Sequence, residues 1–155
     1  MSTLRTQLTQ QLITQLRSVT ANSVMFSQIV AAKVGIYSTD NECLDFLMLH
    51  GSASAGQLSA FTGLTTGAVT AMIDRLETAG YVRREHDRED RRRINVIPNE
   101  TKIMADIAPH TMPMGDAVEA LCAELSEEEL EIILKFMTKA NSAASEVISK
   151  AREDG

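Results

Sequence analysis

The hydrophobic and polar positions of this chain predict a mainly α-helical protein with one short β-hairpin. Leucine recurs every four residues at Leu4, Leu8, Leu12 and Leu16, which predicts one long amphipathic helix over residues 1–35. Apolar residues at three- and four-residue spacing predict further helices over 38–50, 54–62, 65–79, 99–123 and 126–151. Residues 81–85 and 93–97 instead have the short β-prone, alternating pattern that is typical of a pair of strands.

Capping residues and prolines set the expected boundaries of these helices. Three residue pairs have the spacing of a capping box, in which each side chain binds the other residue's backbone N–H group: Thr39–Glu42, Ser54–Gln57 and Ser126–Glu129. Pro109 and Pro113 fall inside the 99–123 segment. Because proline lacks the backbone donor and its ring clashes with the carbonyl four residues earlier, we expect this helix to kink or break near 108–115.

The helix over 65–79 has two different faces. Its inner face is an apolar stripe of Val69, Met72 or Ile73, and Leu76. Thr65 or Thr66 can cap its first turn, and Gly80 follows its last turn. Its outer face is small and polar and comprises Thr66, Gly67, Thr70, Ala71, Asp74 and Arg75. Small side chains let a helix approach base edges in a major groove, and hydroxyl groups can bind bases or phosphates. Ordinary surface helices often have such a face too, so this helix alone favours neither interpretation.

The hairpin that follows has a strongly charged tip. From Arg83 to Arg93 the chain has six arginines and four acidic residues, and every basic residue is arginine. The planar guanidinium group suits phosphate recognition and narrow minor grooves. A charged run is usually a solvated loop, but this one comes directly after a capped helix, which favours a DNA-binding wing.

Composition and charge indicate a soluble, single-domain protein. The 155 residues are 44% hydrophobic, 23% charged and only 4% aromatic, which predicts an aliphatic core. The sequence has no run of about 18 apolar residues and no signal peptide, so we expect a cytoplasmic protein without a membrane partner. The net charge is −6, yet residues 53–99 have seven basic and six acidic residues, a net of +1, which leaves −7 on the remainder. This distribution favours binding through one local patch in a defined orientation.

Two segments together resemble the winged helix-turn-helix of the MarR family of bacterial transcription regulators. They are VTAMIDRLETAGYVRR at 69–84, which matches the family's recognition helix, and DREDRR at 87–92, which matches its Asp-x-x-Asp-Arg-Arg wing. Two departures concern the wing. Arg88 stands where proline is common and adds a positive charge, and Pro98-Asn99 replaces the usual Leu-Thr, although Asn99 can still cap the next helix.

The resemblance implies a fold and a function. The fold is a winged helix-turn-helix flanked by N- and C-terminal dimerisation helices, in one domain over 1–155 with the DNA-binding unit at 38–98 and the dimerisation region at 1–35 and 99–151. The function is that of a homodimeric repressor, not an enzyme, which binds a pseudo-palindromic site on double-stranded DNA. The residues expected on DNA are Thr65, Thr66, Gly67, Thr70, Ala71 and Arg75 in the helix and Arg88, Arg91 and Arg92 in the wing, with Asp87 and Asp90 supporting the wing.

Regulation by a small aromatic or other hydrophobic effector is also implied. We expect the effector to bind between the dimerisation helices and the winged unit. The residues expected to line this site are Met25, Phe26, Cys43, Phe46, Leu47 and Ile107, although the same residues suit a plain core. Two alternatives remain open: a winged helix that docks on protein, and a regulator that senses oxidants through Cys43 or Cys122. No cofactor or metal is expected, because the three histidines (50, 86 and 110) lack ligand spacing.

Overall fold

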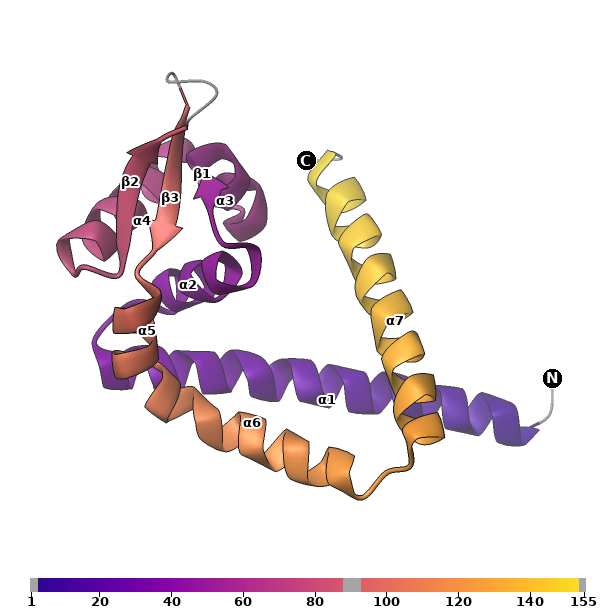
Figure 1. Ribbon diagram of the computed structural model, residues 1–155. Helices are drawn as coiled ribbons and strands as arrows, with labels where there is room; N and C mark the ends of the chain where they lie inside the picture. The colour runs from indigo at the N-terminus through magenta and orange to yellow at the C-terminus, as the bar shows by residue number, and fades with distance from the viewer. Residues whose placement is uncertain (1–2, 88–92, 154–155) are drawn as a thin grey trace. The chain divides into compact units, whose positions relative to one another are not determined.

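The computed structural model describes residues 3–87 and 93–153 and confirms a mainly α-helical fold with a small β-sheet (Figure 1). In chain order the elements are α1 (Thr3–Val34), α2 (Ser38–His50), β1 (Ala53–Ser54), α3 (Ala55–Thr62), α4 (Thr66–Thr78), β2 (Val82–His86), β3 (Ile94–Pro98), α5 (Glu100–Asp106), α6 (Ala108–Ala123) and α7 (Glu127–Glu153). They form two compact units, Met1–Thr111 and Met112–Gly155.

The core of the first unit is aliphatic, as the composition predicts. Its most deeply buried large side chains lie on α1, α2, α3, α4 and β3 and include Val30, Leu44, Leu47, Leu58, Val69, Met72, Ile73, Leu76 and Val96. Ile103 of α5 and Ile107 also join this core. The whole predicted apolar stripe of α4 is therefore buried, and this burial determines which side of α4 faces outward.

The sheet has three antiparallel strands in the order β1-β3-β2. Strands β2 and β3 form the predicted hairpin, with Arg84 opposite Val96, and β1 pairs with the other edge of β3 through Ala53 and Ser54. The two-residue strand β1 is not evident in the sequence, because it is too short to show an alternating pattern. It fixes the start of α3 against the hairpin.

Two of the three expected capping boxes are present. At α3, Ser54 Oγ accepts from the Gln57 backbone N–H at 3.3 Å, and Gln57 Oε1 accepts from the Ser54 N–H at 2.8 Å. Before α7, Ser126 and Glu129 make the same two bonds at 3.3 and 2.8 Å.

The third expected capping box, Thr39–Glu42, is wrong. Helix α2 begins at Ser38, and its N-cap is Tyr37, whose side chain makes no capping bond. Because the helix starts before Thr39, that residue lies within the first turn rather than at the cap position, where its hydroxyl would reach a free N–H group.

The break in the 99–123 segment is at Ile107, one residue before the predicted interval. Helix α5 ends at Asp106, and α6 begins at Ala108. The ring of Pro109 would clash with the carbonyl of Ala105 in a continuous helix, so α5 has to end before Pro109. Pro113, by contrast, lies inside α6, which continues to Ala123.

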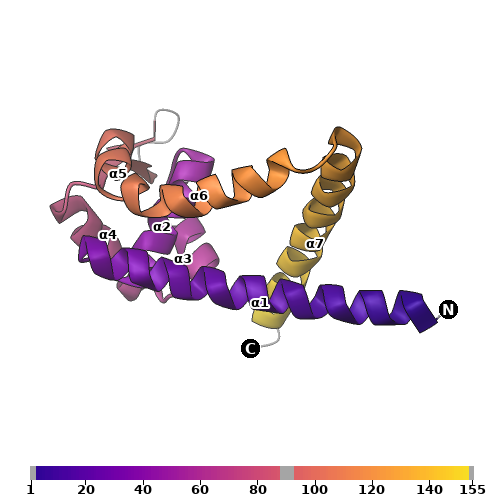
Figure 2. The same cartoon turned by 90° about the horizontal axis from the view of Figure 1, so that it is seen from below.

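Large apolar side chains are exposed on the long helices of both units. Among the described residues of α1, only Val30 and Ala31 are buried, near the carboxyl-terminal end, which lies beside α2 (Figure 2). Leu4, Leu8 and Leu12 on α1 are 65%, 51% and 52% exposed, and Ile132 and Leu134 on α7 are 69% and 68% exposed. No described helix is by itself long and apolar enough to cross a membrane; α1 and α2 meet that criterion only when joined across a bend of 102°.

Candidate nucleic-acid interface

Helices α3 and α4 form a helix-turn-helix with a tight turn. Gly63 ends α3 in the left-handed conformation, at φ +72°, where a side chain would be strained. The hydroxyl of Ser59 donates to the Leu64 carbonyl at 2.7 Å and fastens the turn to α3. Thr65 then caps α4 by accepting from the Ala68 N–H at 3.4 Å, as one of the two predicted alternatives. Gly80, at φ +78°, follows Ala79, which is the C-cap residue of α4.

The predicted outer face of α4 is exposed. Thr65, Thr66, Gly67, Thr70, Ala71, Asp74 and Arg75 all lie on the surface, opposite or beside the buried stripe. Gly67 has a helical φ, and a Cβ atom added there would meet nothing within 4 Å. The fold therefore leaves open space at Gly67. A contact of these residues with DNA stays a prediction.

One flank of α4 is bound to α2 through Arg75. Its Nη2 and Nε atoms donate to the two carboxylate oxygens of Asp40 at 2.7 and 3.2 Å, and its Cζ lies 4.7 Å from the ring centroid of Tyr37. The hydrogen bond with Asp40 raises the pKa of Arg75 further above its ordinary value. Asp40 is only 2% exposed, whereas the side chain of Arg75 stays 42% exposed. No local sequence signal indicates this pair, because its members are 35 residues apart.

The other flank of α4 is bound to the hairpin through Arg84. Its guanidinium group pairs with Asp74 at 2.5 Å and with Glu77, and its backbone N–H donates to Glu77 Oε1 at 2.9 Å. Burial alone lowers the pKa of Arg84, but the hydrogen bonds with Asp74 and Glu77 outweigh that effect and raise it. Both acidic residues of α4 are therefore paired with one arginine from β2.

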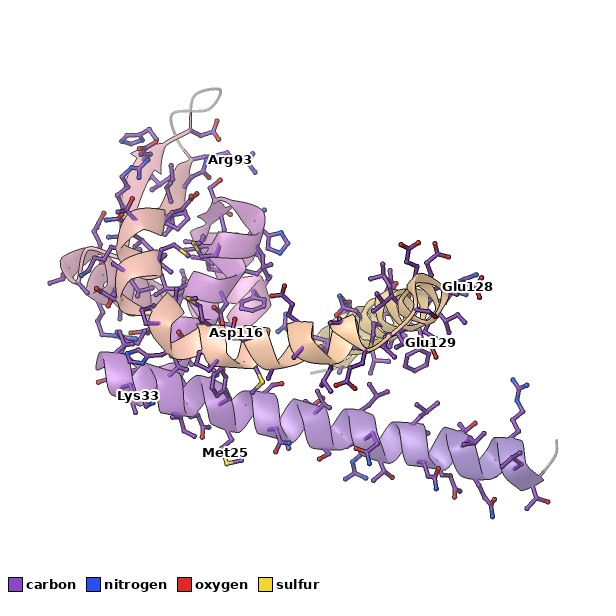
Figure 3. The ribbon with its side chains drawn as sticks, turned by 60° about the horizontal axis from the view of Figure 1, so that its bottom comes forward. Met25, Lys33, Arg93, Asp116, Glu128 and Glu129 are labelled. Atoms are coloured by element: carbon purple, nitrogen blue, oxygen red, sulfur yellow. The ribbon has the colours of Figure 1, made fainter. Side chains whose placement is uncertain are left out.

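The base of the predicted wing is described, but its tip is not. Asp87 Oδ2 accepts from Asn95 Nδ2 at 2.9 Å, and its backbone N–H donates to the Arg93 carbonyl at 2.9 Å. Arg93 is exposed at the far end of the hairpin (Figure 3). Four residues of the wing prediction lie outside the described residues: Arg88, Asp90, Arg91 and Arg92.

Five of the six residues predicted to line an effector site belong to one apolar region. Cys43, Leu47 and Ile107 are core residues no more than 3% exposed, and Phe26 and Phe46 are half-buried against them. The ring of Phe46 also packs at a tilt against those of His50 and Phe61, with centroids 4.3 and 4.4 Å apart. Met25 is 55% exposed on α1 and points away from this region (Figure 3).

The chemistry of the cysteines gives little support to an oxidant sensor. Burial, with a smaller contribution from the charge of Asp40, raises the pKa of the Cys43 thiol from 9.0 to about 12. Since the thiolate is the reactive form, a buried and protonated thiol is inert at neutral pH. Cys122 is half-buried on α6. Within the described residues, no cluster of three or more His, Cys, Asp or Glu side chains could hold a metal ion.

Comparisons with known proteins agree with this geometry. Residues 42–93 match the model of the MarR family. The chain is 38% identical over 149 residues to the HTH-type transcriptional regulator YcgE of Bacillus subtilis, covering 96% of each protein. The relatives are transcription regulators rather than enzymes.

Solved structures share the fold at lower sequence identity. A mutant of S. aureus MepR from a clinical isolate is 20% identical with a TM-score of 0.72, over 86% of this chain and 96% of that one. Another S. aureus MepR mutant, solved bound to an oligodeoxyribonucleotide, is also 20% identical, with a TM-score of 0.56 over 86% and 97%. The fold, the helix-turn-helix and the match to YcgE along nearly the whole chain show that this protein belongs to the MarR family of winged helix-turn-helix transcription regulators.

Proposed function

We propose that the protein is a homodimeric repressor that binds a pseudo-palindromic DNA operator and is released by a small hydrophobic effector. The observation that carries the DNA-binding part is the orientation of α4. Its buried stripe and its two flanking ion pairs direct a small, hydroxyl-rich face with an open glycine position toward solvent. Such a face suits close approach to base edges in a major groove.

Each protomer would use two elements on DNA. Helix α4 would enter a major groove through Thr65, Thr66, Gly67, Thr70, Ala71 and Arg75, and the wing would reach the adjacent minor groove through Arg88, Arg91 and Arg92. Residues 38–98 would thus form the DNA-binding unit, and residues 1–35 and 99–151 the dimerisation region. The exposed leucines of α1 and α7 support dimerisation, because a partner surface would remove them from water.

The salt dependence of DNA binding tests this proposal. An operator is first selected by the wild-type protein from random-sequence DNA, and its affinity is then measured at several salt concentrations. Binding should weaken steeply with salt, and Arg91→Ala or Arg92→Ala should weaken it on every sequence and reduce the salt slope by about one unit. Lys135→Ala, which removes the same charge from the exposed surface of α7, is the matched control and should change neither. If no DNA is selected, the protein-docking alternative takes precedence.

Removing an acidic residue of the wing tests the proposal, because the expected change in operator affinity is opposite to the one that charge repulsion predicts. A carboxylate beside an arginine holds its guanidinium group in one orientation, so less rotamer freedom is lost on binding. Asp90→Ala should therefore weaken operator binding, although it removes a negative charge near DNA. Tighter binding by Asp90→Ala would show that this carboxylate only repels phosphate.

The effector would bind at the apolar region around Cys43, Leu47 and Ile107. The half-buried rings of Phe26 and Phe46 support an aromatic or other hydrophobic ligand there, because both can reach the edge of the core. A compound that releases the operator should lose its effect on Phe46→Ala while that variant still binds the operator. A compound that acts equally on both proteins would place the effector elsewhere.

A further inference from the structure

We infer that Asp40 is a positioning residue for DNA recognition, which acts by holding Arg75 and thereby fixing the recognition helix α4 against α2. This role rests on the proposed function, because it concerns how α4 is presented to DNA. It assigns a function to an acidic side chain that lies outside the helix-turn-helix itself.

The burial of Asp40 makes its pairing with Arg75 obligatory. A carboxylate that is 2% exposed has almost no water to solvate it, so removing its partner leaves an uncompensated buried charge. Arg75 meets both carboxylate oxygens, and such bidentate pairs restrict direction as well as distance. A shift of α4 along α2 would break one or both bonds, so the pair opposes that shift.

The ion pairs on the two flanks of α4 fix its orientation more narrowly than its apolar stripe alone can. Successive helical residues are about 100° apart, so Arg75 and Glu77 point to nearly opposite flanks of α4. Arg75 binds α2 on one flank, and Glu77 binds Arg84 of β2 on the other. Aliphatic contacts are non-directional and tolerate small rotations of a helix, whereas these two ion pairs do not.

Asp40 is itself held in place by its neighbours. Asn41, which is also 2% exposed, donates through Nδ2 to Ser27 Oγ of α1 at 3.1 Å. The ring of Tyr37 covers the guanidinium group of Arg75 at 4.7 Å. The first turn of α2 therefore contacts α1 through Asn41 and α4 through Asp40, and it offers Arg75 a rigid anchor.

The sign of the effect separates positioning from simple electrostatics. Removing a negative charge beside the recognition helix should strengthen binding to any DNA if the charge merely repels phosphate. Removing an anchor should instead weaken binding to the operator, because base contacts depend on the placement of α4, and should spare random DNA, which is bound through phosphates alone.

The test compares Asp40→Asn with wild type on the selected operator and on a random duplex of equal length. We expect operator affinity to fall about tenfold and random-DNA affinity to stay within about twofold, so that discrimination is lost. Asp45→Asn removes a carboxylate from the surface of the same helix and is the matched control, with discrimination unchanged. Melting curves confirm that equal amounts of folded protein are compared.

Two further variants keep the test decisive if Asp40→Asn folds poorly. Arg75→Lys retains the positive charge but cannot meet both carboxylate oxygens, so it should lose discrimination as well. In an Arg75→Met background, Asp40→Asn should cause little further loss of operator affinity, because the two residues act through one another.

The inference is overturned if Asp40→Asn or Arg75→Lys binds the operator as tightly as wild type. It is also overturned if operator and random DNA lose affinity equally. Failure of the proposed function is a different result, in which the wild-type protein itself selects no operator.

Discussion

Gly67 occupies a position on the recognition helix where the fold does not require glycine. Its φ is helical, and an added Cβ would meet open space. Gly67→Ala should therefore preserve or raise the free energy of unfolding, by up to about 1 kcal/mol. Operator affinity should fall at least about tenfold, because the methyl group would occupy space that base edges need.

Gly115→Ala on α6 is the matched control, since a Cβ there also meets nothing within 4 Å. Chemical denaturation and operator titration should show both variants folded and only Gly67→Ala impaired. Normal operator binding by Gly67→Ala would mean that no base or phosphate approaches this point of α4.

Arg84 pairs with both acidic residues of α4, so it sets the charge of the surface that is proposed to face DNA and also holds strand β2 against α4. Arg84→Met would leave Asp74 and Glu77 unpaired beside the DNA, so operator affinity should fall about tenfold or more. Adding Asp74→Asn and Glu77→Gln to the same chain should restore part of the loss by removing the repulsion. Titrations at one salt concentration measure both steps, with Arg17→Met on α1 as the control for a lost arginine. If the added Asp74→Asn and Glu77→Gln substitutions restore no operator affinity, Arg84 acts only by holding the wing.

Cys43 predicts a pH dependence of stability. The thiol ionises near pH 9.0 when the chain is unfolded, and burial raises its pKa to about 12 in the folded chain. A raised pKa of an acid stabilises the folded state fully below pH 9 and loses that contribution as the pH rises toward 12. Between these limits the wild type should lose more free energy of unfolding than Cys43→Ala, by at most about 4 kcal/mol.

Cys122→Ala, which removes the thiol of the other free cysteine, is the matched control for the loss of a thiol group. Mild peroxide should leave the operator affinity unchanged, both in the wild type and in Cys43→Ser. A peroxide response that depends on Cys43 would instead support the oxidant-sensing alternative.

At the scale of elements, the sequence predicts those features whose residues all lie within one short segment. The capping boxes at Ser54 and Ser126 involve residues three apart, and the stripe of α4 repeats within four turns, so both are readable from a short window. The Thr39–Glu42 box has the same spacing but is absent, because α2 starts at Ser38. Spacing identifies a possible cap, whereas the packing of the helix decides where it begins.

Contacts between distant segments are what the sequence does not show. Asp40 and Arg75 are unremarkable in their own helices, and their pairing depends on how α2 crosses α4. The same holds for β1, whose two residues become a strand only because β3 lies beside them. The outer face of α4 was predictable, but the ion pairs that orient it depend on tertiary structure.

The junction between α5 and α6 is the element-scale feature with a testable consequence. Asp106, at the end of α5, accepts from Tyr81 at 3.1 Å, which fastens α5 to the winged unit, and from Lys102 of the same helix at 2.7 Å. Ile107 is the C-cap of α5: its N–H still donates to the Ile103 carbonyl at 2.9 Å, and its own carbonyl accepts from the His110 N–H at 2.9 Å. Pro109→Ala permits a continuous helix and should change operator affinity or effector response severalfold without altering any DNA-facing residue.

Pro113→Ala is the matched control, because α6 already continues through Pro113. It should raise the melting temperature by restoring a helical donor and leave operator affinity unchanged. Circular dichroism and operator titration measure both variants. Equal behaviour of the two substitutions would show that the break at Ile107 has no part in regulation.

At the scale of the whole molecule, the exposed apolar residues predict that folding and dimerisation are linked. Leu12 is 52% exposed on α1 and Leu134 is 68% exposed on α7, in two different units. Burying a leucine side chain contributes about 1.5–3 kcal/mol. In a two-fold symmetric dimer each substitution occurs twice, so a charge at either position should weaken association by about 3 kcal/mol or more. Leu12→Lys or Leu134→Lys should therefore raise the dissociation constant of the dimer about a hundredfold.

Sedimentation over a range of concentrations measures that constant, and melting curves at the same concentrations should show stability falling together with the dimer fraction. Gln15→Lys, which adds the same charge to an exposed polar position of α1, should change neither. The dimer variants should also lose preference for an operator with two half-sites about 34–36 Å apart over one with a single half-site, because only a dimer contacts both. A wild-type protein that sediments as a stable monomer would contradict this account. The exposed leucines would then need another partner, and the operator would have no reason to be symmetric.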